Sequence, residues 1–73
     1  MTTYNVRAYD QDPQQQHQPQ ALEDLLIDTA DRIEARIHAK DFHGFGYWVE
    51  VFADGELIAG PLDPDQPAPS YIL

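Results

Sequence analysis

The chain has 73 residues, of which 13 are acidic and four are basic, so its formal net charge at neutral pH is −9. A chain of this length forms one small domain with a shallow core, and because it has no cysteine, disulfides and thiolate-bound zinc are excluded. The negative charge repels phosphates, so we expect no direct binding of nucleic acids or of anionic membrane surfaces.

The acidic side chains are concentrated in the second half of the sequence. No lysine or arginine follows Lys40, whereas six acids do: Asp41, Glu50, Asp54, Glu56, Asp63 and Asp65. No apolar run approaches the roughly 20 residues that a membrane span needs, and the N-terminus lacks the basic and apolar parts of a signal peptide. We therefore expect a cytoplasmic protein that is neither exported nor bound to a membrane.

The first predicted element is a strand over residues 3–9, in which apolar and polar side chains alternate. Tyr4, Val6 and Ala8 fall on one face, and Asn5 and Arg7 fall on the other with Tyr9. Residues 10–20 are rich in glutamine and proline and offer nothing to bury, so we interpret them as a mobile connector.

A helix is predicted from Ala21 to about Lys40, because the apolar side chains there recur with helical spacing. They form one stripe that we expect to face the core: Leu22, Leu25, Leu26, Ala30, Ile33 and Ile37. The opposite side carries Asp24, Asp28 and Asp31, which would form either an ordinary solvated face or a secondary acidic docking ridge.

Two runs rich in β-formers, residues 47–52 and 56–59, flank Asp54-Gly55 and predict a hairpin. A two-residue turn would leave both faces equally apolar, whereas a three-residue loop with Gly55 in the left-handed conformation pairs Val51 with Leu57. We favour the three-residue loop, because it gathers one core row: Tyr47, Val49, Val51, Leu57 and Ala59. The other face then carries Trp48, Glu50, Phe52 and Ile58.

These elements predict an α+β fold with a β-α-β-β order, in which one helix covers one face of a three-stranded sheet. Residues 1–60 would form the domain, and the order of the strands stays open. The second sheet face has no predicted layer. Its apolar side chains Trp48, Phe52 and Ile58 would then form a patch rimmed by the carboxylates of Glu50, Asp54 and Glu56, and such patches mark protein interfaces.

The last predicted segment, residues 61–73, is a proline-rich extended tail that ends in Tyr71, Ile72 and Leu73. An apolar end after a stiff spacer has two interpretations. The three residues either fold back over Trp48 and Phe52 or anchor a partner, which includes a second copy of the chain.

The sequence gives little evidence of a catalytic or metal-binding site. His38, Asp41 and His43 have a spacing that could bring two imidazoles and a carboxylate to one metal ion, but a fourth ligand is missing, and histidines at a helix end often only interact with the helix dipole. Ser70, the one serine, lies in the tail. We therefore expect no enzyme, no cofactor and no metal.

The small size, the acidity, the lack of cysteine and the strand, helix and Asp54-Gly55 hairpin layout of residues 3–60 resemble the small anti-defence proteins of phages, which include anti-CRISPR and DNA-mimic inhibitors. In such proteins carboxylates imitate phosphates. The resemblance rests on general character and transfers no individual residue. It implies a non-enzymatic inhibitor or adaptor that occupies a basic surface of a protein partner, for instance one in a nucleic-acid-processing or defence complex.

Two other interpretations stay open. The chain could be a homodimeric accessory protein whose uncovered sheet faces pair across a two-fold axis. Its acidity could also be an adaptation to a salty cytoplasm, which the low charged fraction of 23% fits poorly.

Overall fold

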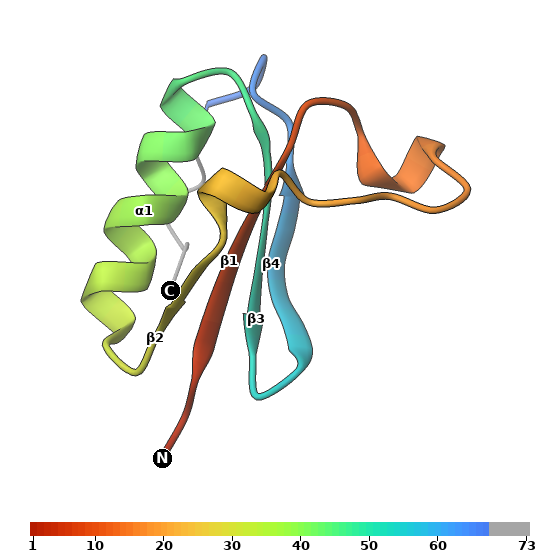
Figure 1. Cartoon of the computed structure of the whole chain (residues 1–73). Coiled ribbons are helices and arrows are strands. Elements are labelled where there is room, and N and C mark those ends of the chain that lie inside the picture. The colour runs from red at the N-terminus through yellow and green to blue at the C-terminus, as the bar shows by residue number, and fades with distance from the viewer. Residues whose placement is uncertain (68–73) are drawn as a thin grey trace.

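The computed structural model describes residues 1–67 and shows an α+β fold with one helix on a four-stranded antiparallel sheet (Figure 1). Two short 3₁₀ turns, η1 and η2, lie between the first two strands. In chain order the elements are β1 (Tyr4–Tyr9), η1 (Pro13–Gln15), η2 (Glu23–Leu25), β2 (Ile27–Thr29), α1 (Arg32–Gly44), β3 (Trp48–Ala53) and β4 (Glu56–Leu62).

The sheet has the strand order β2-β1-β3-β4, and every neighbouring pair is antiparallel. The α+β class, the hairpin and the single helix on one face confirm the sequence-based expectation. The number of strands was wrong, because the segment predicted as the beginning of the helix contains β2. The order left open by the sequence places β1 at the centre of the sheet, beside β3.

The predicted helix over 21–40 is replaced by η2, β2 and a later helix. Ile27 and Thr29 are β-branched and pair with Val6 and Tyr4 of β1. The side chain of Asp31 then caps α1, because its Oδ1 atom accepts hydrogen bonds from the backbone of the first turn. The helix therefore begins at Arg32 and not at Ala21, so about the first half of the predicted helix is not helical.

The helix presents a different face to the sheet from the one predicted. Ala35, Ala39 and Phe42 are buried, whereas Ile33 and Ile37 are 68% and 53% exposed. Ala35 and Ala39 are small, so the helix backbone lies close to the strands. The predicted stripe was wrong because its phase was set by Leu22, Leu25 and Leu26, which precede the helix.

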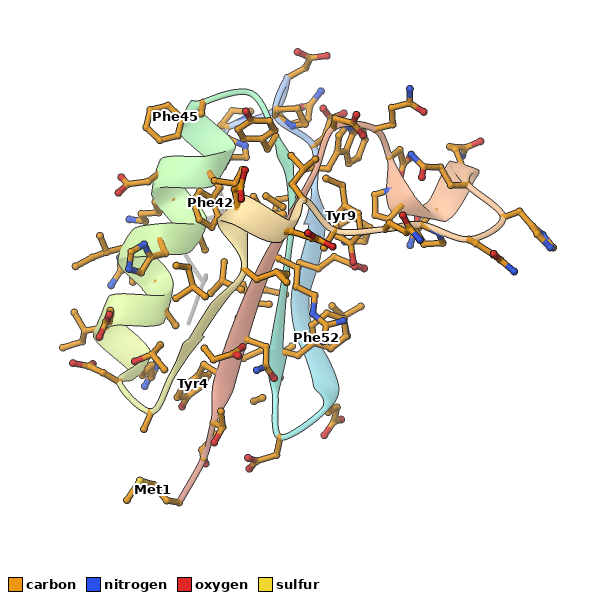
Figure 2. The ribbon with its side chains drawn as sticks, viewed as in Figure 1. Met1, Tyr4, Tyr9, Phe42, Phe45 and Phe52 are labelled. Carbon is orange, nitrogen blue, oxygen red and sulfur yellow. The ribbon has the colours of Figure 1, made fainter. Side chains whose placement is uncertain are left out.

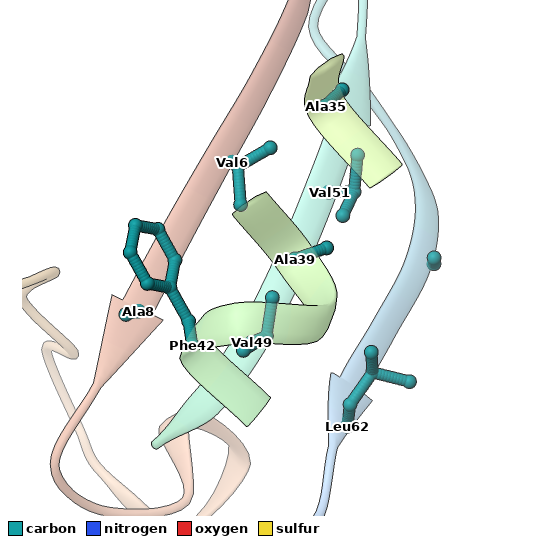
Figure 3. Close-up of a cluster of buried hydrophobic side chains, with 9 residues drawn as sticks. Val6, Ala8, Ala35, Ala39, Phe42, Val49, Val51 and Leu62 are labelled. Carbon is teal, nitrogen blue, oxygen red and sulfur yellow. The ribbon is translucent and has the colours of Figure 1, made fainter. Parts of the chain in front are cut away.

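The core lies between α1 and the sheet, with Val6, Val49 and Val51 fully buried at its centre (Figure 3). The side chains of Ala8, Phe42 and Leu62 pack around them, and the full burial of one such valine stabilises the fold by about 1.5 kcal/mol or more. Val6 and Ala8 come from the strand face that the alternation in residues 3–9 predicted.

A Schellman motif ends α1 and directs the chain into β3. The backbone N–H of Tyr47 donates to the carbonyl of Phe42 (3.1 Å), and that of Gly46 donates to His43 (3.1 Å). Gly46 has a φ of 96°, which suits glycine. Tyr47, half-buried, packs against the core.

The hairpin has the two-residue turn that the sequence argument rejected. Asp54 and Gly55 both have positive φ, as a type I′ turn requires, and Phe52 pairs with Leu57. A register irregularity between Phe52 and Val51 lets Val51 pair with Ala59, and a second one between Val51 and Val49 lets Val49 pair with Leu62. These bulges separate the apolar side chains between the two faces, which a regular ladder could not do.

The segment after β4 begins beside the end of α1. The Nε2 atom of His43 lies 3.0 Å from the carbonyl oxygen of Asp63, to which the N–H of Gln66 also donates. β4 extends to Leu62, beyond the predicted domain boundary at residue 60. The predicted docking residues Tyr71, Ile72 and Leu73 lie outside the described residues.

The predicted connector contains structure of its own. Pro13 is buried in η1, and Asp12 accepts a hydrogen bond from the backbone N–H of Gln14, so the expectation that residues 10–20 bury nothing was wrong.

None of the helices within residues 1–67 is both long and apolar enough to cross a membrane.

Candidate protein-binding surface

The outer face of the sheet, meaning the face turned away from α1, carries aromatic and charged side chains from neighbouring strands. The register places Tyr9 opposite Trp48, Arg7 opposite Glu50 and Asn5 opposite Phe52. Leu57 of β4 lies on the far side of Phe52. Figure 2 shows Tyr9 and Phe52 on this side of the sheet.

Arg7 occupies the centre of the outer face and contacts Phe52. Its guanidinium carbon lies 4.9 Å from the centre of the Phe52 ring, a cation–π distance. Arg7 is exposed, whereas Phe52 is half-buried. The arginine therefore covers part of the aromatic ring and adds a positive charge to a patch for which only apolar and acidic side chains were predicted.

Tyr9 interacts with Glu50 beside this arginine. Burial, together with the hydrogen bond to the Glu50 carboxylate and its negative charge, raises the pKa of Tyr9 to about 12, although Arg7 acts in the opposite direction. The tyrosine hydroxyl therefore stays protonated at neutral pH, and it interacts with the Glu50 carboxylate on the outer face.

The segment between β1 and β2 covers one end of the outer face. Tyr9 is only 5% exposed, and a hollow beside it is lined by Arg7, Tyr9, Pro19, Gln20, Ala21, Glu23, Leu26 and Asp28. Leu26 is 47% exposed there. The outer face therefore consists of an open part around Phe52 and Leu57 and a hollow next to Tyr9.

The predicted patch is changed at its β4 side. Trp48, Glu50 and Phe52 lie on the outer face as expected and are half-buried. Ile58 does not join them, because it lines a separate hollow with Tyr4, Ala53 and Arg32. Leu57, predicted to belong to the core, is 43% exposed and takes the position beside Phe52.

The predicted acidic rim lies around the hairpin turn. Asp54 accepts a hydrogen bond from the N–H of Thr3 (2.9 Å) through its side chain, so it fixes the turn against the start of β1. Glu56 is exposed directly after the turn. Both line the same hollow as Ile58 rather than surrounding Trp48.

The secondary acidic ridge is not formed, because Asp24, Asp28 and Asp31 belong to different elements. Asp24 lies in η2, and Asp28 accepts a hydrogen bond from Asn5 across the strands (2.7 Å). Asp31 is the N-cap of α1. Of the three, Asp28 lies beside the outer-face hollow.

The metal-site candidates are not brought together. His38 lies 3.7 Å from Glu34 and contacts the ring of Phe42, whereas His43 is buried against Asp63. Asp41 is exposed. No group of three or more potential metal ligands is present among residues 1–67.

Sequence reasoning missed Arg7, Leu57 and the hollow beside Tyr9 as parts of the surface. Alternation in the first strand already placed Arg7 and Tyr9 on the face opposite the core, so that signal was available. The two-residue turn places Leu57 opposite Phe52, and Asp-Gly favours that turn, so this signal was available too.

We compared the chain with protein-family models, with curated proteins and with solved structures. None of the three comparisons found a match.

Proposed function

We propose that the chain is a non-enzymatic protein-binding module, an inhibitor or adaptor that applies the outer face of its sheet to a basic surface of a protein partner. The observation that supports this most directly is the position of Trp48, Phe52 and Leu57. These three large apolar side chains lie on the face that the helix leaves uncovered. Buried aromatic side chains dominate the energy of protein interfaces.

The charge of the chain supports a basic partner. The net charge of −9 steers association with a positive surface. The outer face carries Glu50, which interacts with Tyr9, and Asp28, which lies at the edge of the sheet. Arg7 supplies the opposite charge at one point, where an acidic side chain of the partner would fit and where orientation would be selected.

A capture experiment tests this function. The wild-type chain, the double variant Trp48→Ala/Phe52→Ala and the matched control Phe45→Ala are immobilised and exposed to the same host lysate. Phe45 is 74% exposed and lies at the end of the helix, away from the outer face. We expect a protein with a basic surface to bind to the wild type and to the control, and to be lost from the double variant.

Two further readouts decide the nature of the contact. Raising the salt concentration should release the captured protein, since screening weakens contacts between opposite charges. Duplex DNA should displace it if the carboxylates imitate phosphates. Capture that is equal for all three variants would refute the proposed surface, and release by DNA without any effect of the double variant would place the binding elsewhere on the acidic chain.

A further inference from the structure

The solvent-facing side of α1 is an apolar ridge in a helix whose charge differs from that of the rest of the chain. Ile33 and Ile37 are 68% and 53% exposed, and they lie one turn apart. They point away from the buried Ala35 and Ala39, because a separation of two residues turns a helix by about 200°. Large apolar side chains that recur on the exposed side of a helix mark a contact surface.

Basic and acidic side chains flank this ridge on opposite sides. Arg36 lies on one side of the ridge, and Glu34 and Asp41 lie on the other. The helix α1 contains three basic residues and these two acids, so its net charge is +1 (3 − 2). The remainder of the chain has a net charge of −10 (−9 − 1). The helix is thus the part of the molecule on which two copies repel each other least.

The ridge has the spacing of a coiled-coil seam. With Ile33 at position d and Ile37 at position a, Arg36 takes position g and Asp41 takes position e of the next heptad. In a parallel pair of helices these g and e positions face each other across the interface. Arg36 of each copy therefore meets Asp41 of the other copy, and the same two residues cannot pair within one helix, where they lie on opposite flanks.

We propose that two copies of the chain associate through α1 as a parallel, two-fold symmetric pair. Ile33 and Ile37 of both copies form the seam, and Arg36 pairs with Asp41 of the second copy. An antiparallel pair is disfavoured, because its two-fold axis would bring the basic flanks of both helices together. Lys40 takes the next seam position, so the apolar contact is confined to two turns and the dimer is weak.

This dimer leaves the outer faces free. α1 covers the opposite side of the sheet (Figure 1), so the pair has the layer order sheet, helix, helix, sheet, and its two outer faces point in opposite directions. The dimer would present the proposed binding surface twice and could bridge two sites on a partner. It differs from a dimer in which the outer faces themselves pair.

Sedimentation equilibrium over a range of concentrations tests the proposal, with circular dichroism to check that each variant folds. We expect reversible association of the wild type, and a dissociation constant raised at least about tenfold by Ile37→Asp or by Ile33→Asp. The matched control Leu57→Asp changes an apolar residue of similar exposure (43%) on the outer face and should leave association unchanged.

Charge exchange tests the orientation of the helices. Arg36→Glu and Asp41→Arg should each weaken the dimer, and the double variant should restore it to within a few-fold of the wild type. A chain that stays monomeric at all concentrations, an absence of rescue, or loss of the dimer on Leu57→Asp alone would overturn the proposal. Capture through Trp48 and Phe52 is measured separately and can succeed or fail independently.

Discussion

The Nε2 atom of His43 lies 3.0 Å from the backbone carbonyl oxygen of Asp63 and joins the end of α1 to the segment that follows β4. His43 is 9% exposed, so its ring is removed from competing water. Because a carbonyl oxygen can only accept a hydrogen bond, Nε2 of His43 is the donor. This bond fixes the point at which the proline-rich segment leaves the domain.

Replacement of His43 by leucine should lower the free energy of unfolding by about 1–2 kcal/mol, because a buried hydrogen bond is lost while the Asp63 carbonyl keeps its bond to Gln66. Urea denaturation followed by tryptophan fluorescence measures the change. His17→Leu is the control, since His17 is exposed in the connector. Equal stability of both variants would mean that the His43 contact contributes nothing.

The approach of two backbones at Gly60 gives a second prediction. A Cβ atom at this position would clash with the carbonyl oxygen of Val49, and Gly60 also has a φ of 106°. Gly60→Ala should therefore destabilise the fold by more than about 3 kcal/mol. Gly46→Ala has a similar φ of 96° but open space around the new methyl, so thermal denaturation should show a smaller loss, about 1 kcal/mol.

The position of Asp31 predicts which acid before the helix matters for stability. Its Oδ1 atom accepts hydrogen bonds from Ile33 N–H (2.8 Å) and from Glu34 N–H (3.4 Å). Asp31→Ala should cost about 1 kcal/mol in chemical denaturation. Asp24→Ala, at an exposed position of η2, should change stability by less than about 0.5 kcal/mol, whereas equal effects would contradict the start of the helix at Arg32.

Tyr9 should titrate late, since its pKa is raised to about 12. Absorbance titration of tyrosinate should lose its last step in Tyr9→Phe, and Glu50→Gln should move that step to lower pH. The folded chain holds this proton more tightly than the unfolded chain, whose tyrosine ionises near 10. Stability should therefore fall as the pH rises from about 10 to about 12, and this part of the fall should be absent in Tyr9→Phe.

The candidate surface was only partly predictable. The alternation in β1 and β3 assigned Arg7, Trp48, Glu50 and Phe52 to the non-core face, because successive side chains in a strand point to opposite sides. Leu57 and Ile58 exchanged their expected roles, because the turn at Asp54-Gly55 has two residues and pairs Phe52 with Leu57. The register irregularities further along, which place Ala59 opposite Val51, depend on both strands, and no spacing within β4 alone reveals them.

The sequence by itself determined the α+β class, the strand alternation in residues 4–9, the position of the hairpin at Asp54-Gly55 and the excess of negative charge, since each of these depends on local geometry or on composition. Only the tertiary structure decided where the helix begins and which side of it is buried. The leucines at 22, 25 and 26 have helical spacing with Ile33 and Ile37, but Ile27 and Thr29 gain hydrogen bonds and packing by pairing with β1. That long-range pairing outweighs the local helical preference and turns the two isoleucines of α1 outward.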